Sequence, residues 1–235
     1  GLELEYKWYR TKLTMNNIDP FNFEEQEEFD QHINLSIPNY KSLDCIFSHI
    51  AKEFSQPDSV TVDLGCSTGR FLNNLPKVDN CKYIGIDKVN MKTFDGFKHI
   101  VGDCEDVLNE LADVGVISSM FFLQFLGSIK RQKTLKAIKR HIDKGSIFLV
   151  AEKVYLDDTR LQTLLHRMHI QKKRENFTDS EILDKDNQLS VSMFCKTESE
   201  LINELTELGR VTPVWQSYNF LGYVVQSKEY CSNGR

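Results

Sequence analysis

A glycine-punctuated turn at Gly65–Gly69 is the feature of this sequence best placed to hold a ligand. It follows a short β-branched stretch, Val60–Leu64, and leads into residues typical of a helix start. A strand, a tight turn and a helix in this order direct unpaired backbone N–H groups and partial positive charge at a ligand. We expect Gly65 to allow the tight turn and Gly69 to let the helix pack closely on the strand.

The spacing of the glycines indicates which ligand this turn would take. It reads G-x-x-x-G, and Ser67 stands where dinucleotide-binding proteins have the central glycine that contacts a pyrophosphate. Asp87 ends the next apolar stretch, where a carboxylate can bind a ribose diol, and Asp103 follows a third stretch. The set favours an adenosine ligand with a small charged tail, and S-adenosylmethionine (SAM) fits best. The alternatives are a nicotinamide enzyme or an α/β domain without a ligand.

Metal and disulfide chemistry find little support in the cysteines and histidines. The six cysteines are scattered and contain no C-x-x-C pair, which favours a reduced, cytoplasmic protein over a disulfide framework or a zinc site. His166 and His169 are three residues apart on an expected helix but lack a third ligand. We therefore expect a surface or packing role for both histidines, and no metal.

Composition narrows the class of partner. The chain has 235 residues, 40% of them hydrophobic, which suits one α/β domain with additions. The formal net charge of −5 speaks against a globally basic surface, so direct nucleic-acid binding is not expected. No apolar run is long enough to span a membrane, and Gly1–Glu5 lack the basic start and apolar core of a signal peptide. A small-molecule substrate is the expected partner.

Hydrophobic periodicity predicts alternating strands and helices along the chain. Strands are expected at 60–64, 82–86, 98–101, 114–119, 146–151, 210–216 and 219–227. Helices are expected at 22–34, 43–54, 69–75, 104–111, 128–142, 157–174 and 198–208. Repeated βα units indicate a parallel sheet with right-handed crossovers, and the last two strands add an antiparallel edge. The predicted fold is α/β: the doubly wound, seven-stranded, Rossmann-like sheet of class I SAM-dependent methyltransferases.

The chain divides along this pattern as a single domain, 1–235. We expect an N-terminal helical cap at 1–57, a cofactor-binding half at 58–151, a substrate-side helical insertion at 152–195 and a C-terminal helix and strand pair at 196–235. The expected helix at 128–142 has a basic face, which we interpret as solvated, with a phosphate-contacting patch as the alternative. Its residues are Lys130, Arg131, Lys133, Lys136, Lys139 and Arg140.

Short segments spread along the chain carry a more specific resemblance. They are Ser36–Tyr40, Asp63–Ser67, Asp79–Lys82, Ile86–Asp87, Gly102–Asp103, Leu123–Leu126, Glu152–Lys153, Met168–His169, Lys173–Arg174 and Tyr218–Phe220. In these segments, from about Phe23 to Val225, the chain resembles the carboxy-SAM synthase family, which serves the 5-oxyacetyl modification of wobble uridine in tRNA. The Gly-Cys-Ser turn and the Leu-Gln-Phe-Leu segment are not general to methyltransferases.

The resemblance implies a cofactor site for SAM, with S-adenosylhomocysteine (SAH) or carboxy-SAM as other bound forms. Its residues would be Tyr40, Asp63, Gly65, Cys66, Ser67, Asp87, Lys88, Asp103 and Cys104. The tyrosine would cover the cofactor, and the turn would line the methionine moiety. The acid that ends the second strand would bind the ribose hydroxyls, and the pair after the third strand would flank the adenine. The family's dimers also imply a homodimer.

Two positions depart from the family pattern on the substrate side. Met120 stands where the family has an asparagine, and Asp186, after Lys185, stands where it has an arginine that binds the product's carboxylate. An arginine binds a carboxylate bidentately, whereas an aspartate repels it by about 4 kcal/mol at ~4 Å and an effective dielectric constant of about 20. Lys173 or Arg174 could replace the arginine.

Three functions remain open at this point. The first is a diverged SAM-dependent transferase that moves a methyl group to an unidentified acceptor, which both departures support. The second is a carboxy-SAM synthase, acting on SAM and prephenate, with a rearranged carboxylate clamp. The third is a non-catalytic SAM-binding protein. The candidates for a general base are Tyr40, His169 and Tyr218, and those for a cationic pocket are Lys153, Arg167, Lys173 and Arg174.

Overall fold

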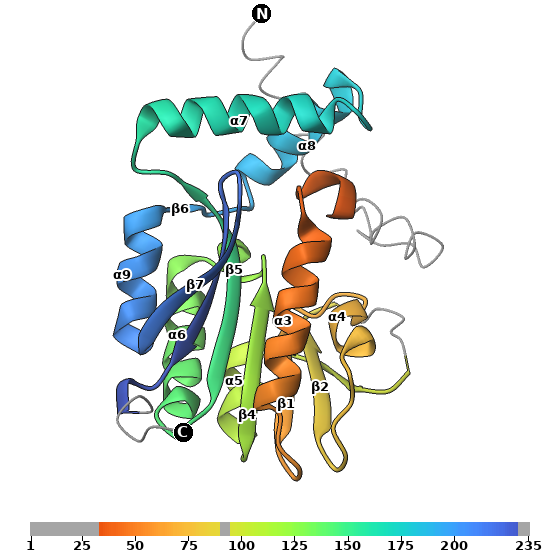
Figure 1. Cartoon of the computed structure of the whole chain (residues 1–235), viewed down its shortest axis with the longest axis vertical. Coiled ribbons are helices and arrows are strands. Elements are labelled where there is room, and N and C mark those ends of the chain that lie inside the picture. Colours follow the sequence, from red (N-terminus) through yellow and green to blue (C-terminus); the bar gives the residue numbers. More distant parts are fainter. Residues whose placement is uncertain (1–32, 90–94, 230–235) are drawn as a thin grey trace, which may run out of the picture.

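The computed structural model of the chain describes residues 33–89 and 95–229 (Figure 1). Of the helix expected at 22–34, all but the last two residues lie outside the described residues. None of the described helices has the length and apolar character needed to cross a membrane.

One mixed sheet forms the centre of the fold, with strand order β3-β2-β1-β4-β5-β8-β7. The strands are β1 (Val60–Leu64), β2 (Lys82–Asp87), β3 (Lys98–Val101), β4 (Val114–Met120), β5 (Ile147–Tyr155), β6 (Lys196–Thr197), β7 (Arg210–Ser217) and β8 (Phe220–Gln226). The five strands from β3 to β5 pair in parallel, and β8 and β7 are antiparallel. The predicted fold class and its seven-strand path are confirmed.

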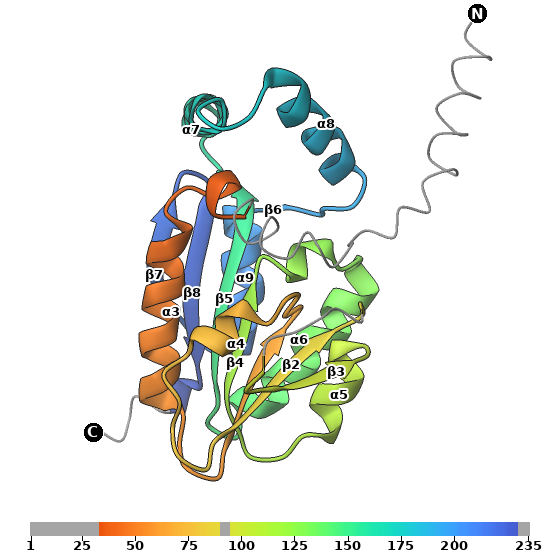
Figure 2. The same ribbon diagram turned by 90° about the vertical axis from the view of Figure 1, so that its right-hand side faces the viewer.

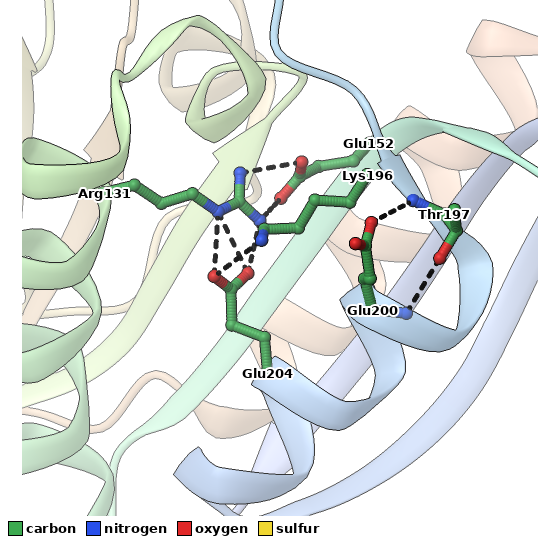
Figure 3. Close-up of polar contacts among 6 residues, drawn as sticks. All are labelled: Arg131, Glu152, Lys196, Thr197, Glu200 and Glu204. Carbon is green, nitrogen blue, oxygen red and sulfur yellow. Dashed lines mark hydrogen bonds and ion pairs between the residues drawn. The ribbon is translucent and has the colours of Figure 1, made fainter.

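An eighth strand, β6, was not predicted. It exists because β5 continues to Tyr155, past the expected end at 151, and its last two residues pair with Lys196 and Thr197. The insertion therefore returns to the sheet at the carboxyl end of β5 before the last helix begins. That helix begins where expected, since Thr197 and Glu200 form a capping box at its start (Figure 3).

The helices cover both faces of the sheet and one of its edges (Figures 1 and 2). They are α3 (Tyr40–Phe54), α4 (Arg70–Asn74), α5 (Cys104–Glu110), the short 3₁₀ helix η2 (Leu123–Phe125), α6 (Ser128–Ile142), α7 (Thr159–Lys173), α8 (Asp179–Ser190) and α9 (Glu198–Leu208). Helices α3 and α4 lie on one face, and α5, α6 and α9 lie on the other. Helices α7 and α8 lie above the carboxyl edge of the parallel strands.

The insertion thus covers the edge of the sheet at which α/β proteins bind ligands. Within it, α8 was not predicted, because only Ile182 of its residues is buried and no apolar face repeats. A capping box of Thr178 and Glu181 was the available signal for its start.

Alternation along β1 decides which of its side chains can reach the ligand. Val60, Val62 and Leu64 belong to the core under α5, α6 and α9. Since successive side chains of a strand point to opposite faces, Asp63 points toward the other layer, where α3 packs. A carboxylate is thereby buried at the end of the central strand.

The interpretation of the basic face of α6 as solvated is wrong for Arg131. Its side chain is only 4% exposed and forms a fork with Glu152 of β5, at 2.9 and 2.8 Å (Figure 3). Glu204 of α9 accepts from the same guanidinium at 2.5–3.1 Å, and Lys196 lies 3.5 Å from that carboxylate. Burial disfavours the charged form, but these carboxylates outweigh it, so the pKa of Arg131 is raised. The cluster joins α6, β5, β6 and α9.

Candidate functional site

The turn after β1 is folded tightly against the end of β2. Gly65 and Gly69 have φ of +65° and +77°, in the left-handed region that favours glycine. The amides of Gly65 and Cys66 both donate to the carbonyl of Ile86, at 2.8 and 3.1 Å. A Cβ atom at Gly65 would lie 2.2 Å from the Phe122 ring, so only glycine fits there.

Asp87, at the end of β2, accepts hydrogen bonds from backbone amides of this turn and of the segment after β2. Its Oδ2 accepts from the amide of Ser67 at 2.9 Å, and its Oδ1 accepts from the amide of Val89 at 3.0 Å. A carboxylate has about four lone-pair positions, so these two bonds leave one free position on each oxygen. Two remaining acceptors match the two hydroxyls of a ribose, and the residues present therefore fit the adenosine ligand expected from the sequence.

Asp103, after β3, forms ion pairs with two lysines. Lys88 and Lys130 each place Nζ 2.7 Å from its Oδ1. Hydrogen bonds from Lys130 and Lys88 lower the pKa of Asp103, which stays ionised. Lys88 directly follows Asp87, the last residue of β2. Its ion pair with Asp103 therefore connects the carboxyl ends of β2 and β3.

Tyr40, the first residue of α3, is buried at the opposite side of the turn. The Arg70 guanidinium lies 4.8 Å from its ring centroid, and the Phe121 ring lies 6.1 Å away. Burial raises the pKa of the Tyr40 phenol above its ordinary value, and Arg70 only partly opposes this. The phenol therefore stays protonated, which weakens it as a general base and leaves its expected role as a cover for the cofactor.

Cys66, within the turn, and Cys104, the first residue of α5, are both buried. Burial raises the pKa of the Cys66 thiol above its ordinary value and that of the Cys104 thiol to about 12. Since the thiolate is the nucleophile, neither residue is poised for covalent chemistry at neutral pH. Both remain candidates for small groups that line the site.

Asp63 is a buried acid that titrates near neutrality. It is 5% exposed and accepts from Ser118 Oγ at 2.7 Å. Burial raises the pKa of Asp63 from 3.8 to about 7, despite the Ser118 hydrogen bond, and the charge of Asp87 adds to the rise. The folded protein therefore binds a proton between about pH 4 and 7 that the unfolded chain has released.

Asp63→Asn is accordingly expected to stabilise the ligand-free protein as the pH rises. The wild type loses stability between about pH 4 and 7, and the difference between these pKa values corresponds to about 4 kcal/mol. Asparagine keeps an acceptor for Ser118 and has no charge to desolvate. Urea unfolding at pH 5 and pH 8.5 measures the effect. An equal stability difference at both pH values would mean that Asp63 is ionised throughout.

The residues expected on the substrate side begin at the end of β4. Met120 is half-buried there, and Gln124 of η2 follows the turn. Gln124 Oε1 accepts from the backbone amide of Lys153 at 2.8 Å, and its Nε2 lies 3.1 Å from Met193 Sδ. Gln124, which the sequence placed only in a family-like segment, thus connects the ends of β4 and β5 to the insertion.

The insertion adds two buried groups above this edge, His169 and Lys173 of α7. They are 2% and 8% exposed. Burial lowers the pKa of Lys173, the charge of Lys153 lowers it further, and Asp186 of α8 opposes the change. These interactions place Lys153, Lys173 and Asp186 in one electrostatic neighbourhood.

Arg174 is not part of that neighbourhood. It is exposed and pairs with Asp179 at 2.7 Å. Arg167 is also exposed. Of the four cations named as pocket candidates, the structure therefore brings together Lys153 and Lys173. The described residues contain no group of three or more side chains suited to a metal ion.

Comparison with solved structures defines the class of this fold. The chain superposes on the small RNA methyltransferase HEN1 with a TM-score of 0.54 at 16% identity, covering 81% of this chain and 25% of that one. It superposes on the pyocyanin biosynthetic protein PhzM with a TM-score of 0.51 at 13% identity, covering 76% and 53%. At these identities the likeness shows the fold, the doubly wound α/β fold that the three chains share.

Sequence relatives define the family. A carboxy-S-adenosyl-L-methionine synthase from Idiomarina loihiensis is 34% identical over 186 residues, covering 72% of this chain and 76% of that protein. One from Shigella boydii serotype 4 is 30% identical over 232 residues, covering 90% and 93%. One from Colwellia psychrerythraea is 28% identical over 229 residues, covering 89% and 93%. No family model matches the chain. The chain belongs to the carboxy-S-adenosyl-L-methionine synthase family.

Proposed function

We propose that this protein transfers a methyl group from SAM to a small-molecule acceptor, and that it does not make carboxy-SAM. The observation that carries the proposal is the place of Asp186. It is half-buried on α8, and its negative charge acts on the buried Lys173. In the family resemblance an arginine stands at this position and binds a carboxylate. An acid there removes one cation and adds one negative charge, which leaves too little positive charge for a dianion such as prephenate.

Methyl transfer makes modest demands on the protein. SAM supplies the electrophilic methyl group on its sulfonium, so the chain's own task is mainly to bind and orient the reactants. In this proposal Asp87 holds the ribose, the turn after β1 holds the methionine moiety, and Tyr40 covers it. Asp103 and Cys104 flank the adenine. Met120 then gives the acceptor an apolar surface.

Carboxy-SAM synthesis from SAM and prephenate, for tRNA wobble-uridine modification, is the second candidate. It is favoured by the two ammonium groups of Lys153 and Lys173, which could together bind a dianion. The third candidate, a SAM-binding protein without activity, would keep the cofactor residues and lack turnover. Carboxy-SAM itself would be a bound ligand only in the second case.

The first test compares wild type with Asp186→Arg, both incubated with SAM and prephenate. We expect no carboxy-SAM from the wild type and a measurable yield from the variant, because the arginine restores a carboxylate fork. Mass spectrometry of the nucleosides detects it. Asp184→Arg, at an exposed position of the same helix, is the matched control for added charge. Carboxy-SAM from the wild type would contradict the proposal.

Turnover itself is tested with SAM labelled in its methyl group and a small-molecule extract. We expect the label in a small molecule and one SAH per transfer. SAM binding with no SAH formed in any fraction would favour the non-catalytic function instead. A chain that binds neither SAM nor SAH would contradict all three candidates.

We propose in addition that the protein is a homodimer. Six exposed apolar side chains lie on the insertion: Leu161, Leu164, Met168, Leu183, Val191 and Phe194. The first three follow helical spacing on α7. Leu164→Glu is expected to shift the molar mass measured by light scattering from dimer to monomer, because it buries a charge in an apolar interface. Ile129→Glu, on the exposed surface of α6, should leave the mass unchanged.

The cytoplasm is the compartment we propose. The described cysteines, Cys45, Cys66, Cys81, Cys104 and Cys195, are all free thiols. Free thiols are typical of a reducing compartment. Localisation of a fluorescent fusion in cells would test this, and a signal outside the cytoplasm would contradict it.

A further inference from the structure

The imidazole ring of His169 has one buried nitrogen, Nδ1, that forms no hydrogen bond with the residues that the structure describes. Its Nε2 lies 2.8 Å from the carbonyl oxygen of Ser36, and because a carbonyl only accepts, Nε2 carries the hydrogen. Nδ1 is therefore the unprotonated nitrogen of a neutral ring. It is fully buried and has no hydrogen-bond partner among the residues that the structure describes.

A buried acceptor without a donor costs free energy, and such atoms call for an explanation. Protonation does not provide one. Burial lowers the pKa of His169 to about 4, despite the hydrogen bond to Ser36, and the positive charges of Lys173, Lys153 and His166 add to the effect. At neutral pH the ring stays neutral, so Nδ1 can be satisfied only by a donor from outside the described chain.

Lys173 lies one helical turn further along the same face of α7. It is only 8% exposed, and within residues 33–89 and 95–229 no ion pair or side-chain hydrogen bond is found for it. The charges acting on it are those of Lys153, Lys185 and Asp186, two ammonium groups against one carboxylate. A buried cation in that balance is stabilised by an added anion.

Both groups lie close to the edge where the methyl group would be transferred. The His169 ring contacts Phe220 edge-on at 5.1 Å, and Phe220 contacts Phe121 in the same way at 5.7 Å. Phe121 follows Met120, the last residue of β4. His169 is therefore linked through two aromatic rings to the carboxyl end of β4, and Lys173 lies near Lys153 of β5.

We propose that His169 and Lys173 form the subsite that binds the polar end of the acceptor. The ligand class is a small oxyacid that presents an anionic oxygen to Lys173 and a neighbouring O–H to Nδ1 of His169, such as a 2-hydroxy acid. The inference rests on the proposed methyl transfer, whose acceptor it describes. The competing role for His169 is purely structural, as a clamp between α7 and Ser36.

The two side-chain amides separate these roles. Glutamine places its NH₂ group near the position of Nε2, so His169→Gln keeps the donor to Ser36 and removes the acceptor. Asparagine places its oxygen near the position of Nδ1, so His169→Asn keeps the acceptor and removes the clamp. His166→Gln, one turn away on α7, is the control.

The probes are lactate and 3-phenyllactate, each compared with its O-methyl ether, titrated by calorimetry into protein saturated with SAH. We expect the wild type to bind a hydroxy acid about tenfold more tightly than its ether, the effect of one buried hydrogen bond. His169→Gln should lose this preference at an unchanged melting temperature. His169→Asn should keep the preference and melt lower. Lys173→Met should bind neither probe and melt higher.

A second readout does not depend on the variants. In protein labelled with ¹⁵N-histidine, Nδ1 of His169 should resonate as an unprotonated nitrogen at neutral pH and shift with the hydroxy acid but not with the ether. Equal binding of acid and ether by the wild type, or a preference retained in His169→Gln, would overturn the subsite. If SAH binds and the acids do not discriminate, only the subsite fails. If SAH does not bind, the proposed function fails.

Discussion

Replacing Asp87 with alanine is expected to weaken SAH binding about 100-fold or more. The proposed ribose contacts are two hydrogen bonds to a charged acceptor, each contributing about 1.5–3 kcal/mol. The same carboxylate also accepts from the amides of Ser67 and Val89 and so keeps the turn after β1 in place. The substitution therefore removes both the ligand's partner and the brace of the loop, and calorimetry with SAH measures the combined loss.

Two further variants separate these contributions. Asp87→Asn keeps one acceptor oxygen and should fall between wild type and alanine. Asp79→Ala removes an exposed acid at the surface and should leave SAH affinity within about threefold of wild type. An Asp87→Ala variant that binds SAH as well as the wild type would place the ribose elsewhere.

Arg131→Met is expected to destabilise the protein by about 3–5 kcal/mol. It removes the only cation that faces Glu152 among the ion pairs of the described chain, and that carboxylate is 1% exposed. Glu204 keeps only Lys196, at 3.5 Å. An uncompensated buried charge costs far more than the packing that methionine retains, so urea unfolding should show a large loss.

If unpaired buried charge causes this loss of stability, removing the carboxylates together with Arg131 should restore it. Replacing the whole cluster, Arg131→Met with Glu152→Leu and Glu204→Leu, should recover most of the lost stability, because no charge then remains buried without a partner. Lys133→Met, on the exposed face of α6, should change stability by less than about 0.5 kcal/mol. A loss below about 1 kcal/mol for Arg131→Met would mean that water or rearrangement solvates Glu152.

Elements with strong local patterns were predictable from the sequence. Val60–Leu64 is a buried, β-branched strand, and α9 begins at a capping box, so their bounds match the expectation. The right-handed βα repeat then fixes the order of the parallel strands. The antiparallel pair β7 and β8 was predictable because only a short turn separates the two strands.

Features that depend on distant partners were not predictable. Arg131 has the sequence context of a solvated helix face, and only Glu152 and Glu204, far along the chain, make its burial favourable. Strand β6 needs the extension of β5, and α8 buries only Ile182 and so has no repeating apolar face. Local periodicity contains none of this information.

The candidate site also has one half that local sequence patterns predict and one half that depends on distant partners. Its cofactor half follows from local chemistry, a glycine turn and an acid at a strand end, and the structure brings those residues together. Its substrate half depends on how α7 and α8 lie over the sheet. The bare Nδ1 of His169 and the buried Lys173 arise from that packing, so the sequence could name both residues without predicting their state.

The central claim is that the protein uses SAM as a methyl donor and makes no carboxy-SAM. The most direct measurement is the mass of the nucleoside that co-purifies with the protein, released by denaturation and analysed by mass spectrometry. SAM or SAH is the predicted result. A nucleoside heavier than SAM by one carbon dioxide would be carboxy-SAM, and it would contradict the account.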